Sequence, residues 1–563
     1  MRFSVKTTAA HRQADTPSCA DPRATGHVFL SGVMVLTLST VLVKVIGLFY
    51  KIPMLHYLGS EGMGYFNAAY EWYATLCVIS TSGLPLASSM MIARARASHC
   101  DGTVGHIERL AMRVFAVLGI VGSLVLFLGA GPIAVLIGSP DTRYALMAVA
   151  PTMLFSCLSG AYRGYFQGHQ DMIPTAVSQV IEALGKLILG LLFAVLAWRR
   201  GMSTPHIAAW AMLGLSIGVA ISTLYLMLHR HGYAASQIHF NEMNVNEAES
   251  AQYSPLRKLL GIAVPVTISS FVMSLTRLFD MTMILRRLQS IGYNSAGANA
   301  LYGNYTTMVV PIFNLIPSLI TSVALALVPT LTAAIKAGDT LAQQTTARTA
   351  IRLTALLSLP ASLSLAIYSR AVLSLLFRGQ QVAVEQAAPM LSLLSMSVFF
   401  SAVITTTNAI LQAYGRVHAP IVSMLTGSIL KLITAYVLIG IPRINIYGAP
   451  ISTFACDAMI VGVNLYLIAK HTDVLESLKT ALLRPLGAAT VSVGLPGLAY
   501  ALFTRAGYSE ILLFFAAVPV TLVLYLLVCL RSGLLGEYEL SMLPNSLSSL
   551  VLRLCRCTKK RNG

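Results

Sequence analysis

Apolar segments long enough to cross a lipid bilayer recur along almost the whole of this chain. A spanning helix needs about 20 mostly apolar residues, and such runs follow one another between residues 28 and 530. Of the 563 residues, 56% are apolar and only 11% are charged, against about 25% charged in soluble domains. The sequence therefore predicts an all-helical, multi-pass membrane protein. An outer-membrane barrel is excluded, because its strands would alternate apolar and polar residues.

The apolar runs predict about fourteen spans, most of them joined by short connections. The exception is the stretch 230–257, which is polar and partly acidic and is typical of a linker between two halves. If the N-terminus is cytoplasmic, inside segments carry 25 of the 39 lysines and arginines and outside segments carry 9. Because cytoplasmic loops collect Lys and Arg, both termini are expected to be cytoplasmic. The net charge of +18 is thus explained by topology, without a nucleic-acid partner.

Two segments of the chain resemble each other. Gln167–Lys186 and Gln412–Lys431 both run from a Gln through a turn and a Pro into a helix with a Lys nineteen residues after the Gln. They lie in the fifth and eleventh predicted spans, and Leu278-Phe279 of the seventh span repeats Leu48-Phe49 of the first. Parallel repeats of this kind occur in transporters that rock around a central site.

The repeat divides the chain into two pseudo-symmetric six-helix bundles with two further helices at the C-terminal end. The predicted parts are a basic N-terminal tail (1–27), an N-terminal bundle (28–229), a cytoplasmic linker (230–257), a C-terminal bundle (258–470), two extra spans (471–530) and a basic cytoplasmic tail (531–563).

Signatures of enzymes are missing or out of context. Gly214-Leu-Ser-Ile-Gly218 fits the nucleophile-elbow pattern, but it lies inside an apolar span rather than on a strand-turn-helix. There is no phosphate-binding loop, no HExxH sequence and no cysteine spacing of a metal site. We therefore expect no catalysis, no metal and no cofactor. Gly160, Gly164 and Gly168 are expected to allow close helix packing.

The charges inside the spans are the informative polar residues. Lys44 and Lys51 in the first span are two helical turns apart and project from one face, about 10 Å from each other. A charge in the bilayer core is costly and needs a partner, a cavity or a function. Lys51 has the alternative of reaching the headgroups, and Glu71 at the start of the second span can pair with either lysine.

The seventh and eleventh spans carry the second set of charges. Arg277 and Asp280 are spaced i,i+3 and can pair locally, although Arg also has donors to spare for a phosphate. Lys431 has no carboxylate on its own helix, so it either pairs with Asp457 of the twelfth span or faces the cavity. Several cations in one cavity suit a diphosphate better than a cationic drug.

Glu182 and Lys186 of the fifth span stand i,i+4 in the favourable order. This spacing predicts a structural pair in which the two charges neutralise each other.

One ordered set of motifs resembles a known family. It comprises Lys44-x-x-Gly-x-x-Tyr-Lys-Ile-Pro53, then Leu58-Gly-x-Glu-Gly-x-Gly64, then Gly83-Leu-Pro85, with the Gln-Gly…Pro segment at 167–174 and its repeat at 412–420. This order resembles the stage V sporulation protein B-like, polysaccharide-biosynthesis branch of the multidrug/oligosaccharidyl-lipid/polysaccharide (MOP) flippase superfamily. It implies two six-helix bundles around a V-shaped cavity, and it covers most of residues 28–530.

The resemblance also implies a function, namely flipping of an undecaprenyl-diphosphate-linked saccharide across the bacterial cytoplasmic membrane by alternating access. Lipid II flippases of this superfamily use cavity arginines on the first, second and eighth spans. This chain differs, since it has lysines on the first span and Arg277 on the seventh. Lipid II and a related cell-envelope glycan precursor are therefore both candidate cargoes.

Together these patterns lead to a flippase hypothesis. Lys44, Lys51, Arg277 and Lys431 would hold the diphosphate, and Glu71, Asp280 and Asp457 would pair with these cations or bind a coupling ion. The expected partners are the lipid-linked saccharide and membrane lipids. Two alternatives stay open: a cation-coupled multidrug exporter of the same fold, and a non-transporting scaffold that assembles envelope-synthesis proteins.

Overall fold

The computed structural model describes residues 22–97, 101–238, 255–416, 418–471 and 475–534. These residues form helices joined by short turns, and none of them is in a β-strand. The predicted all-helical membrane fold is thereby confirmed. Most of each predicted tail and most of the predicted linker lie outside the described residues.

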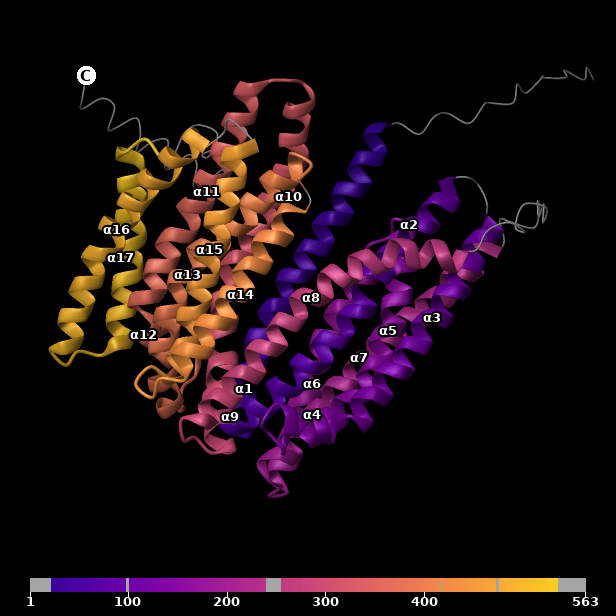
Figure 1. Ribbon diagram of the computed structural model, residues 1–563, viewed down its shortest axis with the longest axis horizontal. Coiled ribbons are helices and arrows are strands. Elements are labelled where there is room, and N and C mark those ends of the chain that lie inside the picture. The colour runs from indigo at the N-terminus through magenta and orange to yellow at the C-terminus, as the bar shows by residue number, and fades with distance from the viewer. Residues whose placement is uncertain (1–21, 98–100, 239–254, 417, 472–474, 535–563) are drawn as a thin grey trace, which may run out of the picture.

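The first element, α1 (Pro22–Thr81), is too long for one crossing of a bilayer, because 60 residues of helix measure about 90 Å. The helix is interrupted at Gly59, whose φ of 66° lies in the left-handed region that glycine adopts readily. Here the chain turns back, so that α2 (Gly83–Ala97) lies near the same end of the molecule as the start of α1 (Figure 1). This interruption falls within the Leu58–Gly64 segment and separates the first two predicted spans.

The remaining helices fall into two bundles that lie side by side, with the last two helices on the outer flank of the second (Figure 1). The first bundle continues with α3 (Asp101–Leu128), α4 (Ala130–Leu136), α5 (Thr142–Gly168), α6 (Ile173–Arg199) and α7 (Thr204–Ile238). The second contains α8 (Pro255–Ser290), α9 (Ser295–Asn304), the π-helix η2 (Tyr305–Val309), α10 (Val310–Lys336), α11 (Thr340–Ile367), α12 (Ser369–Leu376), α13 (Gln381–Ala413), α14 (Ala419–Ile439), the 3₁₀-helix η3 (Asn445–Tyr447) and α15 (Gly448–His471). The two helices on the outer flank are α16 (Leu475–Arg505) and α17 (Glu510–Arg531).

The internal repeat is visible in the backbone of the two turns that precede α6 and α14. Gln170 and Gly415 stand at equivalent positions, three residues after the repeated Gln, and both have a positive φ, of 61° and 74°. Each also donates its backbone N–H to the carbonyl of that Gln, at 3.0 and 2.9 Å. A proline then opens each helix, where its missing N–H costs nothing.

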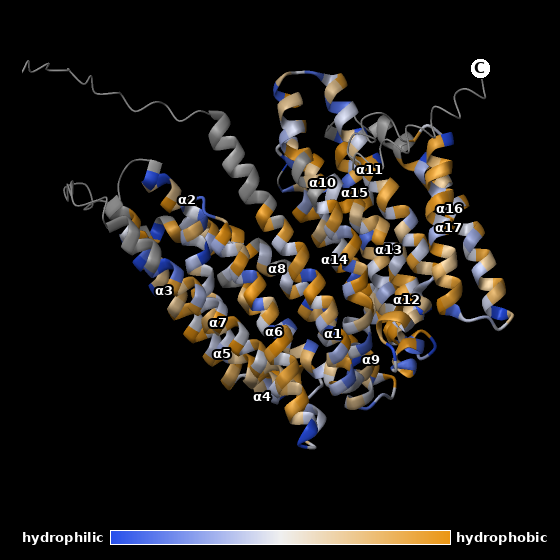
Figure 2. Ribbon diagram, turned by 180° about the vertical axis from the view of Figure 1, so that it is seen from behind, coloured by the Kyte–Doolittle hydropathy of each residue, from blue (hydrophilic) through white to orange (hydrophobic). Residues whose placement is uncertain are grey.

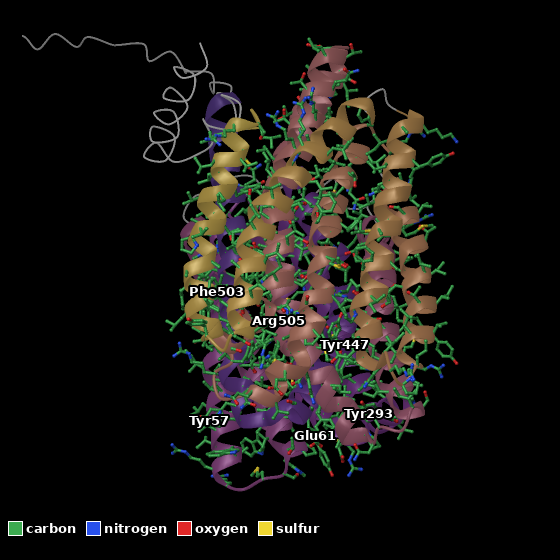
Figure 3. All side chains as sticks on the ribbon, turned by 90° about the vertical axis from the view of Figure 1, so that its left-hand side faces the viewer. Tyr57, Glu61, Tyr293, Tyr447, Phe503 and Arg505 are labelled. Carbon is green, nitrogen blue, oxygen red and sulfur yellow. The ribbon has the colours of Figure 1, made fainter. Side chains whose placement is uncertain are left out.

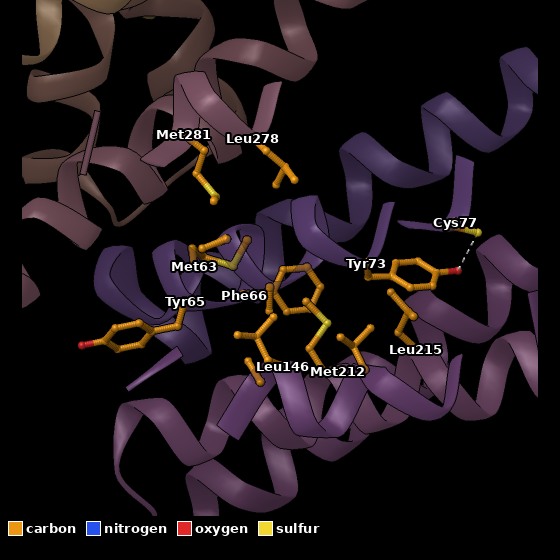
Figure 4. Packing of buried hydrophobic residues seen from close by; sticks show 14 of the residues in the cluster. Met63, Tyr65, Phe66, Tyr73, Cys77, Leu146, Met212, Leu215, Leu278 and Met281 are labelled. Atoms are coloured by element: carbon orange, nitrogen blue, oxygen red, sulfur yellow. Dashed lines mark hydrogen bonds between the residues drawn. The ribbon is translucent and has the colours of Figure 1, made fainter. Parts of the chain in front are cut away.

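The largest hydrophobic core joins the first bundle to α8. Leu278 and Met281 of α8 point toward Met63 and Phe66 of α1 in the same cluster (Figure 4). Farther along α8, a Cβ placed on Gly83 of α2 would lie 2.2 Å from a backbone oxygen of α8, so the two backbones touch. The helix that opens the second half of the sequence is therefore packed against the first bundle.

Small residues allow similarly close packing within the first bundle. A Cβ on Gly164 of α5 would lie 2.3 Å from the Ser88 hydroxyl of α2, and one on Gly168 would lie 2.7 Å from Ile92. The packing role predicted for these two glycines is confirmed.

Hydrophilic residues are concentrated toward the two ends of the helices, and hydrophobic residues predominate between them (Figure 2). Tyr57, Glu61 and Tyr293 all lie toward the lower end of the molecule (Figure 3), as expected where an aromatic belt meets water. Within the described residues, eleven helical segments are long and apolar enough to span a membrane. The first of them, Leu38–Arg96, has 59 residues and contains the turn at Gly59. The count of fourteen spans and the boundaries of the predicted parts stay predictions.

Candidate functional site

The two bundles meet closely where α1 turns back. A Cβ on Gly303 of α9 would lie 2.1 Å from the Ser60 carbonyl oxygen, and one on Gly64 would lie 2.2 Å from that of Asn299. These are contacts between backbones, so neither position has room for a side chain. The Asn299 amide also donates to the Ser139 hydroxyl at 2.9 Å. The bundles are therefore sealed against each other at this end.

Lys51 reaches across the boundary between the bundles. Its ammonium donates to the backbone carbonyl of Thr306 in the π-helix, at 2.7 Å. The wider π turn is a local irregularity that is frequent at functional sites, and here it is the feature that Lys51 meets. On the other side of the Gly59 turn, Asn67 of α1 donates its side-chain amide N–H to the Thr307 hydroxyl, at 2.8 Å. Lys51 thus donates to a neutral carbonyl, and no carboxylate lies within salt-bridge distance of its ammonium among the described residues.

Glu71 lies at the centre of the charged residues. Its Oε2 is buried and has no hydrogen-bond partner among the described residues. Four charged side chains are near enough to act on it electrostatically, namely Arg277, Lys51, Asp280 and Lys431. The structure therefore brings together charges from α1, α8 and α14, which lie far apart in the sequence.

Lys431 forms a salt bridge with Asp280, with 2.7 Å between Nζ and Oδ2. Both side chains are largely buried, at 19% and 14% exposure. Asp457, one of the two alternatives predicted for Lys431, does not form a salt bridge with it. The Oδ2 of Asp457 is buried without a hydrogen bond in the described part of the chain. The local pair of Arg277 and Asp280 is also not formed, because Asp280 turns to α14.

Arg277 is exposed and donates to the Ser274 hydroxyl of its own helix at 3.0 Å. Lys44 is exposed as well, two turns before Lys51 on α1, and no hydrogen bond or salt bridge ties it to another described residue. Both cations are therefore free to meet an approaching anion.

The first bundle contains a separate charged group that differs from the prediction. Glu182 forms its salt bridge with Arg163 of α5, at 2.9 Å, and not with Lys186. Arg163 also donates to Ser178 at 3.0 Å, so its planar fork spans one turn of α6. Lys186 lies instead over the ring of Tyr70, with 4.1 Å from Nζ to the centroid. The predicted structural pair is thus replaced by an Arg–Glu pair and a cation–π contact.

Tyr70, Glu182 and Lys186 line a cavity of about 190 Å³ inside the first bundle. Its wall combines the charged Glu182 and Lys186 with the aromatic rings of Tyr70 and Tyr73. A pocket with this lining offers an anion a cation and offers a sugar ring a stacking surface. No group of three or more metal-ligating side chains is found in the parts of the chain that the structure describes.

Several members of the site were not found by sequence reasoning. Arg163 stands between Gly160 and Gly164, near the end of a predicted span, and the spacing of charges on α6 pointed to Lys186 instead. Thr306 and Asn67 are neutral residues, and nothing in the sequence indicates that they belong to the site. Nothing in the sequence places Tyr70 beneath Lys186.

Buried intramembrane charges between two helical bundles with an internal repeat define a membrane transporter. Comparison with known proteins gives its family: the "Polysaccharide biosynthesis protein" family matches residues 29–335, more than half of the chain, and the chain belongs to it. The MatE family matches residues 265–437. The chain is thus a transporter of the MOP flippase superfamily and not an enzyme.

Three proteins of Bacillus subtilis are similar along most of their length. The stage V sporulation protein B is 24% identical over 93% of this chain and 99% of its own. The uncharacterized membrane protein YabM is 25% identical, over 95% and 98%. The lipid II flippase MurJ is 25% identical, over 75% and 79%.

Solved structures share the fold. A lipid II flippase MurJ in an inward closed conformation has a TM-score of 0.65 at 13% identity, covering 88% of this chain and 98% of that one. An inward-facing multidrug resistance MATE transporter has a TM-score of 0.60 at 14% identity, over 81% and 99%. At these identities the likeness concerns the fold, and the predicted helical architecture of the MOP superfamily is confirmed.

Proposed function

We propose that this protein is a flippase that moves an anionic, undecaprenyl-diphosphate-linked saccharide from the inner to the outer leaflet of the bacterial cytoplasmic membrane. The cargo would be lipid II or a related precursor of a cell-envelope glycan. Its polar headgroup would enter between the two bundles while the prenyl tail stays in lipid. The two termini would be cytoplasmic, as the distribution of Lys and Arg favours.

The observation that carries this proposal is the cluster of charges around Glu71. Lys51 and Arg277 approach it from the two bundles, and neither has a carboxylate at salt-bridge distance among the described residues. A diphosphate would supply the anionic oxygens that these two cations lack, with Arg able to bind two oxygens at once. Lys431, already neutralised by Asp280, would join only if that pair opened.

Lys44 gives the site an approach from the cytoplasmic side. It is exposed on α1 between the start of the helix and Lys51, so that an incoming diphosphate would meet Lys44 first and Lys51 second. Release outward would require the contacts at Gly64 and Gly303 to separate. An inside-negative potential would favour outward movement of a negative lipid, by about 2.3 kcal/mol per charge per 100 mV.

Glu71 and Asp280 would occupy the cations when cargo is absent. Asp280 already does so in this structure, through Lys431. Asp457 and the unpartnered oxygen of Glu71 are the groups that would take a coupling cation, if one is used.

Depletion of the protein, followed by analysis of lipid-linked intermediates, tests the proposal directly. We expect one diphosphate-linked saccharide to accumulate in the cytoplasmic leaflet. In reconstituted vesicles the double variant Lys44→Ala/Arg277→Ala should lower the flipping rate of that lipid by about tenfold or more, since each charged hydrogen bond contributes about 1.5–3 kcal/mol. Arg277→Lys should retain part of the rate, and Arg505→Ala, exposed at the end of α16, should retain all of it.

The same variants distinguish the other functions. A multidrug exporter would lower drug accumulation in cells, and Glu71→Gln would abolish that effect while leaving envelope growth intact. A scaffold would support normal envelope growth when Lys44 and Arg277 are both alanine. Either result, obtained with a folded and normally expressed variant, would falsify the diphosphate site.

A further inference from the structure

A groove of about 340 Å³ runs along the exposed side of α8 and α14, away from the charges around Glu71. The α8 residues that line it stand three or four apart and form a single stripe along the helix, with one residue of α14 opposite. The lining residues are Phe279, Thr282, Met283, Arg286, Arg287 and Ser290 of α8, and Tyr436 of α14.

The inner part of the groove is apolar and open. Phe279 and Tyr436 form its walls and are 59% and 54% exposed. On α14 the neighbouring Ile433 and Val437 are 57% and 52% exposed, so the apolar surface continues beside the groove. In a membrane protein such a surface faces lipid chains.

Two adjacent arginines close one end of the groove. Arg286 donates to the backbone carbonyls of Leu136 at 3.0 Å and Val135 at 2.5 Å, which belong to the last turn of α4. Arg287 donates to the Tyr436 carbonyl at 2.9 Å and lies 4.1 Å over the Tyr436 ring. All of these partners are uncharged, and no salt bridge of either arginine is found among the described residues. Two full positive charges therefore remain at the mouth of the groove.

The position of this pair along the membrane is informative. Arg287 stands in the last turn of α8, directly after Arg286, and Tyr436 stands in the last turn of α14. With the topology proposed above, both helices end at the outer surface, where Lys and Arg are disfavoured. A chain that retains two arginines there, without carboxylates, gains something from their charge.

We propose that this groove binds an anionic phospholipid of the outer leaflet. Arg286 and Arg287 hold the phosphate, using the donors that their contacts with backbone carbonyls leave free, since a guanidinium has five. One acyl chain lies along Phe279, Met283 and Tyr436. The lipid thus sits beside the contact of α8 with α4, where the two bundles are joined.

The lining favours a phospholipid over the lipid-linked saccharide. A saccharide needs many hydrogen-bonding side chains, and besides the arginines the groove offers only the hydroxyls of Thr282, Ser290 and Tyr436. A phosphodiester needs only the two guanidinium groups, and an acyl chain needs only the apolar walls. The two parts of a phospholipid thus match the two parts of the groove.

The experiment uses the purified full-length protein in detergent, with phosphatidylglycerol and phosphatidylcholine of the same acyl chains as probes. Native mass spectrometry counts the lipids retained, and thermal unfolding measures stabilisation. We expect phosphatidylglycerol to be retained about tenfold better than phosphatidylcholine, because a factor of ten corresponds to about one hydrogen bond between charged groups. Arg286→Gln/Arg287→Gln should remove this preference.

Two further variants make the result specific. Arg199→Gln/Arg200→Gln removes an adjacent, exposed arginine pair at the end of α6 that does not line this groove, and should leave the preference unchanged. Thr282→Phe fills the groove while keeping both arginines, and should lower retention of phosphatidylglycerol as strongly as the arginine variant.

Three outcomes would overturn the proposal. The first is equal retention of phosphatidylglycerol by the wild type and the Arg286/Arg287 variant. The second is an equal loss in the Arg199/Arg200 variant, which would indicate attraction to any positive surface. The third is retention of a diphosphate-linked lipid, but not of phosphatidylglycerol, by these arginines.

Discussion

Lys186 and Lys431 hold equivalent positions in the two halves of the chain, yet they are kept in the membrane by different means. Lys431 forms an ion pair with Asp280 of α8. Lys186 lies among aromatic rings, 4.1 Å from the centroid of Tyr70 and 5.4 Å from that of Tyr50. By the match of Leu48-Phe49 to Leu278-Phe279, Tyr50 is the counterpart of Asp280. One change of residue type thus replaces an ion pair by a cation–π contact.

The difference shows how one repeat can serve two purposes. The lysine of the second half is neutralised and ties α14 to α8, which itself packs on the first bundle. The lysine of the first half keeps its net charge, because a ring attracts a cation without cancelling it. It also lines the cavity with Glu182. The second half therefore supplies a structural lysine, and the first half supplies one that can engage an anion.

The largest effect is expected from breaking the ion pair of the second half. Asp280→Ala leaves Lys431 buried without a carboxylate, and removal of one partner of a buried pair costs about 3–5 kcal/mol. We expect a clearly lower thermal unfolding temperature in detergent. Asp280→Leu/Lys431→Met, which removes both charges, should recover most of the loss. A single variant as stable as the wild type would show that Lys431 is not structural.

A second prediction concerns the contact that keeps the two halves docked. Gly303→Ala places a methyl group 2.1 Å from the Ser60 carbonyl, and overpacking of this kind costs about 1–3 kcal/mol. The bundles should separate at this end, and a cysteine at Met63, which is fully buried, should become reactive to an impermeant maleimide once the native cysteines are replaced by alanine. Gly261→Ala has open space around its Cβ and should change neither property. Unchanged labelling in the Gly303 variant would place the seal elsewhere.

Sequence alone predicted the features that depend on periodicity and turn chemistry. The all-helical membrane fold and the repeat around Gln167 and Gln412 follow from local patterns, and the structure contains them. The functional role of the charged residues in the spans stays a prediction, which rests on the cost of placing a charge in an apolar span.

The partners of those charges could not be predicted, because they depend on how the helices face one another. Glu182 has Lys186 on its own helix, and yet it bonds to Arg163 from α5. Asp280 likewise forms its salt bridge with Lys431 of α14 and not with Arg277, which lies on its own helix. Spacing along one helix shows which groups can meet, whereas packing of neighbouring helices decides which of them do.

A smaller effect is expected from the aromatic contact of the first half. Tyr70→Leu removes the ring beneath Lys186, and a desolvated cation–π contact contributes about 2 kcal/mol. Thermal stability should fall by less than in Asp280→Ala, and Tyr70→Phe, which keeps the ring, should remain near the wild type. If Phe were as harmful as Leu, the Tyr70 hydroxyl and not its ring would be responsible.

The smallest effect is expected from Arg163→Ala. Glu182 loses its partner, but Lys186 stands one turn along the same helix in the order that favours pairing. It can leave Tyr70 and take over the carboxylate, so the single variant should lose no more than about 1 kcal/mol. Arg163→Ala/Lys186→Ala removes both partners and should lose more than the sum of the two single changes, which a double-mutant cycle of unfolding temperatures measures. Strict additivity would mean that Lys186 never reaches Glu182, and the first half would then hold its lysine as rigidly as the second.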